Sequence, residues 1–383
     1  MTRHRYAELD ALRGIAALIV VVRHFVNIFP RDAYPVADLL VKAPTRILFA
    51  AHEAVLLFFL LSGFVLATSI ISSGGLSSGS MPSGAGYLTF VRKRVYRIYP
   101  PYAAAVGLAA LGAICLAEPI TGLSGWFGLT WSEPVTLRIL ADHLLLVGSF
   151  DTAQLNTAFW SLVHEMRISL AFPALLLFTV RAPLWLVAAA AAGATALAGG
   201  SSPYGGDWLP TFHYAGIFAL GAVMARNIEA IRARYAATST PVRNAAGVIA
   251  VLLVMYGLGP PALREHLGYF TDWFVVAGLV WLMVLALSNK RVRAILNLPA
   301  LQYLGRVSYS LYLVHATVLF ALVHLLPIWL VGLLYLPLSF GLTAVFHMLI
   351  EVPSIGMARE VGCRPATTCR AAHGTGTLHA PPS

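Results

Sequence analysis

Charged residues are scarce in this chain of 383 residues. Asp, Glu, Lys and Arg together make up 11% of it, whereas an average soluble domain carries about 25%. Hydrophobic residues make up 58%, so most of the folded surface cannot face water. The shortage of charge excludes an ordinary soluble protein and predicts an all-α, polytopic membrane helical bundle.

Acidic residues and cysteines are also few. The 16 acidic residues leave a formal net charge of +10. In a membrane protein such an excess reflects basic cytoplasmic loops, so we expect membrane lipids and not nucleic acid as partners. Three cysteines provide no disulfide framework. Cys115 lies in an apolar run, and Cys363 and Cys369 lie in a polar segment where reduced thiols are expected. We expect no metal and no permanently bound cofactor.

Long apolar runs are abundant, and a membrane-spanning helix needs about 20 mostly apolar residues. We predict ten spans, at 11–29, 50–71, 96–117, 158–179, 183–199, 211–226, 243–259, 270–288, 303–325 and 328–350. An eleventh run, 139–150, is short and contains Asp142 and His143, so it is expected to be re-entrant or interfacial. The apolar run at the N-terminus is interrupted by Arg23 and lacks a small-residue cleavage site, unlike a signal peptide.

The distribution of basic residues predicts the topology. If the N-terminus is cytoplasmic and the ten spans alternate, 18 of the 26 Lys and Arg residues lie in inner segments. This pattern follows the positive-inside rule and places both termini in the cytoplasm. We predict a transmembrane domain over 1–358 and a disordered polar cytoplasmic tail over 359–383. The Gly- and Ser-rich segment 72–86 is expected to be a flexible inner loop.

The first span carries ionisable side chains on one face. Arg13 and His24 are eleven residues apart, which brings them within about 20° of the same direction and about 16 Å apart along a helix. Asp10 lies one turn below Arg13, so an ion pair is expected there. Intramembrane charges are functional candidates by default, although a structural ion pair and an interfacial histidine are the simpler alternatives. Arg23 points elsewhere, and we expect it to anchor a lipid headgroup.

The fourth span begins "FWSLVHEMRISLAFP". Counted from the outer end of this helix, Glu165 lies about 9 Å deep, similar to the depth of His24. A carboxylate and an imidazole at one level can form a charge-assisted pair that sets the histidine tautomer and raises its basicity. We therefore predict a Glu165–His24 pair. The alternative is that Glu165 pairs with Arg167 or His164 for packing alone.

Two further segments carry polar candidates. In "VRKRVYRIYPPY", Arg94 and Arg97 are three residues apart and face the same way. They suit a phosphate clamp, or else they form a basic cluster that sets the topology.

The ninth span, "LGRVSYSLYLVH", supplies Ser308, Tyr309, Tyr312 and His315, which could equally hold helices together. Glu351 is expected at the inner surface in a structural role.

Six stretches of the chain, taken in order, resemble membrane acyltransferase family 3, a family of bacterial inner-membrane O-acyltransferases. They are "LDALRGIAALIVVVRHF", "LFFLLSGFVLA", "RKRVYRIYPPY", "FWSLVHEMRISLAFP", "LGRVSYSLYLVH" and "IEVP", between residues 9 and 353. The resemblance implies transfer of an acyl group, usually acetyl, from cytoplasmic acyl-CoA to a hydroxyl of a glycan, a lipid-linked sugar or a secreted acceptor at the outer face.

The resemblance also implies roles for individual residues. Arg13 and His24 match the essential Arg-x10-His pair of the family, and Glu165 matches its fourth-span acid. Arg94 and Arg97 match the Arg-x2-Arg of the donor entry. After the acid many members continue with Gln or Glu, Phe and Tyr, whereas this chain has Met166, Arg167 and Ile168.

The resemblance further suggests a mechanism, in which His24 is the general base, oriented by Glu165, and Arg13 lies on the donor path. Asp10, Ser308, Tyr309 and His315 are supporting candidates. Taken alone, the charged stripe would also suit a proton-coupled transporter or a flippase of a lipid-linked sugar. Against a transporter, the sequence lacks paired halves with matched broken helices.

Overall fold

Helices make up the regular structure of the computed structural model, which describes residues 6–42, 44–72, 84–202, 204–256 and 266–361; these ranges contain no β-strand. The long helices are α1 (Ala7–Asn27), α3 (Ala51–Ser72), α4 (Gly84–Leu116), α6 (Phe159–Arg181), α7 (Leu184–Ala198), α8 (Leu209–Arg226), α10 (Thr240–Tyr256), α12 (Phe270–Ser288), α14 (Pro299–Leu325) and α15 (Ile328–Phe346). The shorter elements are α2 (Pro35–Lys42), η1 (Pro44–Phe49), η2 (Phe127–Leu129), α5 (Leu137–Leu145), η3 (Thr152–Gln154), α9 (Ile228–Ala237), α13 (Lys290–Leu296), η4 (His347–Glu351) and α16 (Val352–Glu360).

Each of the ten predicted spans overlaps one long helix, and the prediction of an all-α polytopic membrane bundle is confirmed. Within the described ranges, six helices are long and apolar enough to cross a membrane, or seven if α8 and α9, bent by 72°, form one span. Of the others, α1 carries several charges and α7 and α10 are short. Ten crossings and cytoplasmic termini therefore stay predictions. Most of the predicted inner loop and tail, with Cys363 and Cys369, lies outside the described residues.

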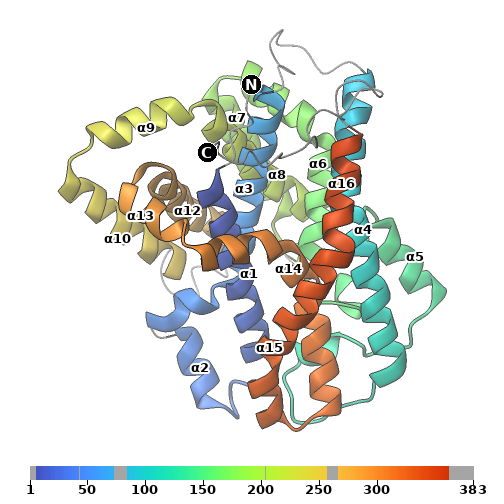
Figure 1. Cartoon of the computed structure of the whole chain (residues 1–383). Helices are drawn as coiled ribbons and strands as arrows, with labels where there is room; N and C mark the ends of the chain where they lie inside the picture. The colour runs from blue at the N-terminus through green and yellow to red at the C-terminus, as the bar shows by residue number, and fades with distance from the viewer. Residues whose placement is uncertain (1–5, 43, 73–83, 203, 257–265, 362–383) are drawn as a thin grey trace, which may run out of the picture.

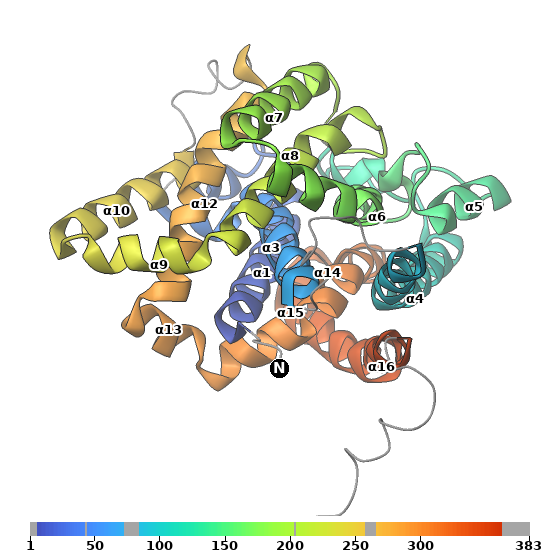
Figure 2. The same ribbon diagram turned by 90° about the horizontal axis from the view of Figure 1, so that it is seen from above.

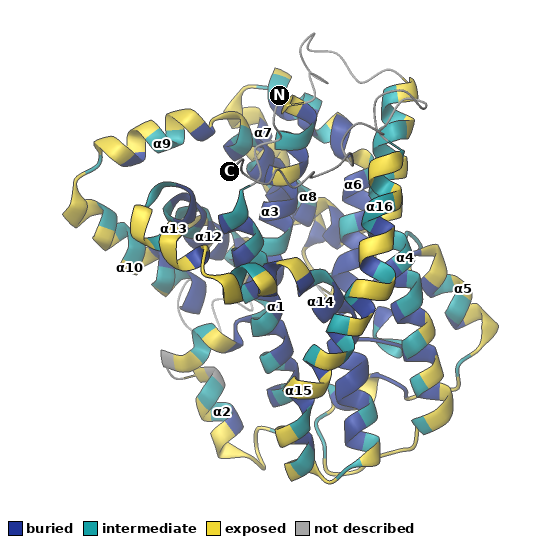
Figure 3. Ribbon diagram, in the orientation of Figure 1, coloured by how far each residue is buried: buried dark blue, intermediate teal, exposed yellow. Residues whose placement is uncertain are grey.

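The bundle has a buried centre with more exposed helices around it. Seen from above, α1, α3 and α14 lie in the middle, with α9, α10, α12 and α13 on one side and α4, α5 and α16 on the other (Figures 1 and 2). Buried residues gather on the central helices (Figure 3). The most apolar stretch of α14 is 83% buried, whereas that of α15 through α16 is 22% buried. An apolar helix this exposed is suited to face lipid.

Helices α1 and α14 touch through two glycines. A Cβ atom on Gly14 would lie 2.6 Å from the backbone nitrogen of Gly305, and one on Gly305 would lie 2.4 Å from the backbone oxygen of Asp10. Such small residues let helix backbones approach closely in a membrane. His24 and His315 each lie ten residues beyond their glycine, and they also touch. The two helices therefore run parallel and hold these histidines at one level.

Helix α4 continues through Pro100 and Pro101. Pro100 has no N–H to donate to the carbonyl of Tyr96, four residues earlier. The hydroxyl of Ser354 on α16 donates to that carbonyl instead. The hydroxyl of Tyr309 on α14 donates to the carbonyl of Ile98, 2.8 Å away. These bonds tie the basic end of α4 to two neighbouring helices.

Candidate active site

A cavity of about 170 Å³ collects three of the arginines that the sequence singled out; we name it the inner cavity after the predicted topology, which puts it towards the cytoplasm. Its lining includes Arg13, Arg94, Arg97 and Glu165. Two of the supporting candidates on α14, Ser308 and Tyr309, also line it. The hydroxyl of Ser308 donates within its own helix, to the carbonyl of Gly305 at 2.9 Å. The cavity thus combines three guanidinium groups with a largely apolar wall.

Glu165 pairs with Arg94. The Nη2 of Arg94 lies 2.5 Å from Oε1 of Glu165, and the Nε of Arg94 donates to the Ser169 hydroxyl at 2.9 Å. The Ser62 hydroxyl donates to the same carboxylate oxygen at 3.1 Å. These bonds fix the guanidinium of Arg94 at the cavity wall.

Arg97 pairs with a carboxylate that the sequence placed at the inner surface. Glu351 is fully buried, and its Oε1 lies 3.0 Å from Nη1 of Arg97. The Ser310 hydroxyl and the His347 ring approach its other oxygen at 2.6 and 2.8 Å. Glu351 ends η4, a π-helical turn, and such turns occur frequently at functional sites. The depth predicted for Glu351, at the inner membrane surface, stays a prediction; the structure adds that protein encloses its carboxylate where η4 and α16 pack against α4.

The predicted Asp10–Arg13 pair is present. Oδ1 of Asp10 lies 3.5 Å from Nη1 of Arg13, and both side chains are partly buried. Each of the three arginines of the inner cavity therefore has a carboxylate partner. Arginine forks match phosphate as well as carboxylate, so these are the groups that could hold an anionic donor.

A second cavity, of about 680 Å³, contains His24 and Arg23; we name it the outer cavity after the same predicted topology. Aromatic side chains surround them, including Trp126, Trp160 and Tyr204. Tyr204 is partly open to solvent, at 61% exposure, and its phenol adds a hydrogen-bonding group to the lining. A wall of aromatic faces with interspersed polar groups can hold an amphipathic organic molecule.

Arg23 faces this cavity instead of lipid, so the predicted headgroup anchor is wrong. The Nε of Arg23 donates to Oδ1 of Asn27 at 2.7 Å, and Nη1 lies 3.5 Å from the carbonyl of Phe49. The cavity is wide enough that the next residue, His24, also lines it although it points about 100° away around the helix.

A buried carboxylate in the outer cavity was not singled out from the sequence. Asp272 on α12 is 6% exposed. Its two oxygens lie 2.9 Å from Nε2 of His52 and 3.2 Å from Nε2 of His213. The signal available in the sequence was an aspartate just inside an apolar run, the same signal that drew attention to Asp10.

His24 pairs with His315 and not with Glu165, so the predicted Glu165–His24 pair is wrong. The Nδ1 of His24 lies 3.0 Å from Nε2 of His315. The depth of Glu165 was misjudged because α6 begins inside the bundle: Phe159 is fully buried, and Asn156 donates to the carbonyl of Leu313 at 3.2 Å. Helix α6 thus starts at the level of His315, and Glu165 lies about 9 Å further in.

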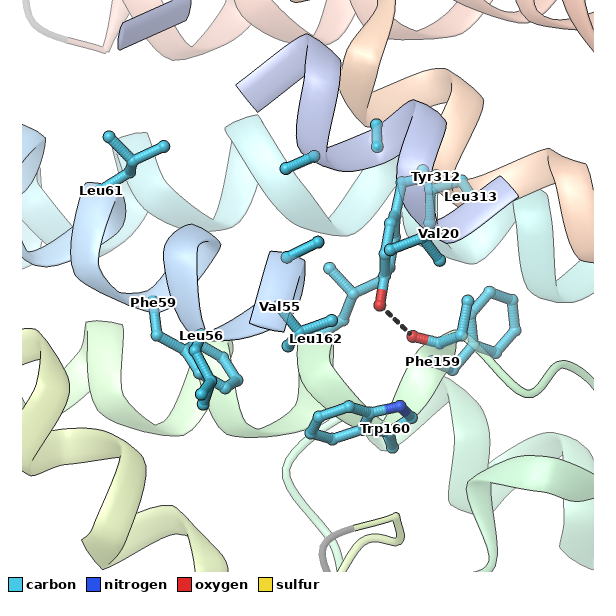
Figure 4. Packing of buried hydrophobic residues seen from close by; sticks show 14 of the residues in the cluster. Val20, Val55, Leu56, Phe59, Leu61, Phe159, Trp160, Leu162, Tyr312 and Leu313 are labelled. Atoms are coloured by element: carbon cyan, nitrogen blue, oxygen red, sulfur yellow. Dashed lines mark hydrogen bonds between the residues drawn. The ribbon is translucent and has the colours of Figure 1, made fainter. Parts of the chain in front are cut away.

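Tyr312 lines both cavities. Figure 4 shows its ring beside Val20 of α1, with the hydroxyl directed towards α6. There it hydrogen-bonds the hydroxyl of Ser161 at 2.7 Å and the carbonyl of Ala158 at 3.1 Å. Its ring lies 5.9 Å, centre to centre, from that of His315. Tyr312 therefore stands between the arginines of the inner cavity and the histidine pair of the outer one.

The family model that matches this chain is described as an acyltransferase domain and covers residues 6–352. The chain belongs to the acyltransferase 3 family. "Acyltransferase MdmB" of Streptomyces mycarofaciens is 26% identical over 340 residues, which cover 82% of this chain and 79% of that protein. "Protein 2 in picA locus" of Rhizobium radiobacter is 32% identical over 180 residues, 43% of this chain and 79% of that protein. No solved structure was found to match.

Membership of the acyltransferase 3 family decides between the alternatives that the charged stripe left open. The protein is a multi-pass membrane acyltransferase, and as such it has an acyl donor and an acceptor. The transporter and flippase alternatives are superseded.

Proposed function

We propose that this acyltransferase moves an acetyl group from cytoplasmic acetyl-CoA to a hydroxyl group of a glycan, lipid-linked sugar or secreted acceptor, across the bacterial inner membrane. The observation that carries the proposal is the pair of cavities that share Tyr312. One is lined by three arginines, the other contains His24. A donor with phosphates at one end and a thioester at the other matches this arrangement.

The donor binds through its phosphates. Arg94 and Arg97 hold the phosphate groups in bidentate fashion, while Arg13 lies beside the pantetheine arm. Glu165 pairs with Arg94, and Glu351 pairs with Arg97. Glu165 therefore acts on the donor side, holding Arg94 in place, instead of acting on His24. Phosphate oxygens replace or share these carboxylate contacts when the donor enters.

The chemistry takes place at His24. Its imidazole removes the proton of the acceptor hydroxyl as that oxygen forms a bond to the thioester carbonyl carbon. The tetrahedral intermediate collapses, the C–S bond breaks, and the proton on the imidazole passes to the CoA sulfur. An acyl-imidazole formed on His24 is the two-step alternative, and trapping labelled protein by acid quenching would distinguish it.

The outer cavity receives the acceptor. Its volume of about 680 Å³ lies within the range of roughly 300–1,000 Å³ usual for ligand pockets. Trp126, Trp160 and Tyr204 offer flat apolar faces, and Asp272 and Arg23 offer hydrogen-bonding groups beside them. Sugar rings have one apolar face and a rim of hydroxyls, which is why we place a glycan first among acceptors.

The test is transfer of radiolabel from [14C]acetyl-CoA into envelope material in inverted membrane vesicles. We expect transfer with the wild-type protein and a loss of about 10²–10⁴-fold for His24→Ala, at equal amounts of protein in the membrane. The matched control is His324→Ala, which removes another histidine near the outer end of α14. Near-normal transfer by His24→Ala would sink the assignment. Mass spectrometry of envelope glycans from deletion and complemented strains then identifies the acceptor.

A further inference from the structure

A chain of two hydrogen bonds ends at the imidazole of His24. The Nδ1 of His315 lies 3.0 Å from the backbone carbonyl of Leu311, and its Nε2 lies 3.0 Å from Nδ1 of His24. His315 is fully buried and His24 nearly so. These two hydrogen bonds determine which ring nitrogen of each histidine carries a proton.

The assignment starts at the carbonyl. A carbonyl oxygen can only accept, so Nδ1 of His315 carries a proton. A neutral imidazole has one N–H, which leaves Nε2 of His315 as an acceptor. The Nδ1 of His24 must then donate to it. The remaining nitrogen of His24, Nε2, has no proton and keeps its lone pair.

A charged His315 would reverse this assignment, but its surroundings disfavour the charge. Among the described residues, its hydrogen bonds go to the Leu311 carbonyl and to His24, neither of them an anion. Burying an unpaired charge is costly. The neutral form, and with it the proton on Nδ1 of His24, is the one that this site stabilises.

We propose that His315 is a positioning residue that fixes His24 in the tautomer whose Nε2 is free to accept a proton. The proposal rests on the proposed function of His24 as general base. It replaces the carboxylate expected beside His24 with a neutral imidazole anchored to a backbone carbonyl. When His24 has taken a proton, its Nδ1–H continues to donate to His315, so the ring does not reorient during the reaction.

Two rigid features hold the hydrogen-bonded chain from Leu311 through His315 to His24, which we call the relay. The bond from His315 to Leu311 spans four residues of the same helix, so α14 itself orients the ring. The contact of Gly14 with Gly305 sets the distance between α1 and α14 ten residues away. His24 is further confined by Trp126, whose ring centre lies 4.9 Å from its own.

Two substitutions at His315 separate positioning from packing. His315→Gln places an amide oxygen near the position of Nε2 and can still accept from His24. His315→Leu removes the acceptor. The matched control is His324→Leu on the same helix, because His324 also bonds the carbonyl four residues earlier, at 2.7 Å, but packs against Phe127 and Trp131.

We expect His315→Leu to lower kcat for acetyl transfer by about 10²–10⁴-fold, approaching the loss of the base itself, with the KM for acetyl-CoA unchanged. His315→Gln should recover most of kcat, and His324→Leu should behave as the wild type. Transfer by His315→Leu at the wild-type rate would overturn the proposal, as would failure of His315→Gln to exceed His315→Leu.

The second readout is independent of activity. In 15N-histidine-labelled protein, with His24 assigned by its loss in His24→Asn, we expect the proton on Nδ1 of His24 at neutral pH. A proton on Nε2 of His24 in the wild type would refute the relay even if His315→Leu failed to fold. If instead the wild-type protein transfers no acetyl group while its tautomer is as expected, the proposed function falls and the relay stands.

Discussion

The glycine contact between α1 and α14 offers a test of how closely the site depends on helix packing. In Gly305→Ala the new Cβ would lie 2.4 Å from the Asp10 oxygen, where an ordinary contact is 3.4 Å or more. The helices must therefore move apart by about 1 Å, at a cost of about 1–3 kcal/mol. The same shift would stretch the 3.0 Å contact of His24 with His315 to about 4 Å, beyond hydrogen-bonding range. A displacement of this size can reduce catalysis by about 100-fold.

The assay for Gly305→Ala is acetyl transfer in inverted vesicles, normalised to the amount of protein, together with the thermal midpoint of the purified protein. The matched control is Gly341→Ala in α15, where a Cβ meets no atom within 4 Å and alanine favours the helix. We expect Gly341→Ala to match the wild type in both measurements. If Gly305→Ala transferred acetyl as fast as this control, close packing of α1 on α14 would not be what sets the catalytic geometry.

Two further predictions concern arginines that contact buried acceptors. Arg97→Gln leaves the buried Glu351 carboxylate without its arginine partner; because the Arg97 side chain is 37% exposed, the loss of stability should be smaller than the roughly 3–5 kcal/mol of a fully buried pair. Adding Glu351→Gln should restore the thermal midpoint but not acyl-CoA use, and recovered transfer would make Arg97 merely structural. Arg167 donates to four carbonyls and one hydroxyl in 147–148 and 206–211, more acceptors than an ammonium can serve, so Arg167→Lys should lower the thermal midpoint with the KM for acyl-CoA unchanged. A raised KM would instead place Arg167 on the donor path.

Most of the fold could be predicted because length and apolarity alone identify buried helices in lipid. The parts that could not were polar. Helix α4 begins at Gly84, twelve residues before its predicted span, because its basic first turns carry no apolar signal. Helices α9 and α13 are polar and lie outside the apolar runs. The eleventh run contributes only the nine-residue α5, which is too short to cross.

Within the site, a predicted relation between two residues was right when both lie on one helix and wrong when it joined two helices. Arg13 and His24 lie on α1, so the helical repeat alone related them, and they now line the inner and outer cavities respectively. The partner of His24 lies on another helix. Predicting whether that partner is Glu165 required knowing the depth at which α6 begins. The sequence of α6 does not reveal that its first residue, Phe159, is fully buried, nor that Asn156 just before it bonds α14. Measured from the true depth of that start, Glu165 falls at the level of the arginines, and His315 is left as the group that reaches His24. The predicted span begins at 158 and α6 begins at Phe159, so the start was right along the chain and wrong in depth. That difference in depth moves the carboxylate from the acceptor half of the reaction to the donor half.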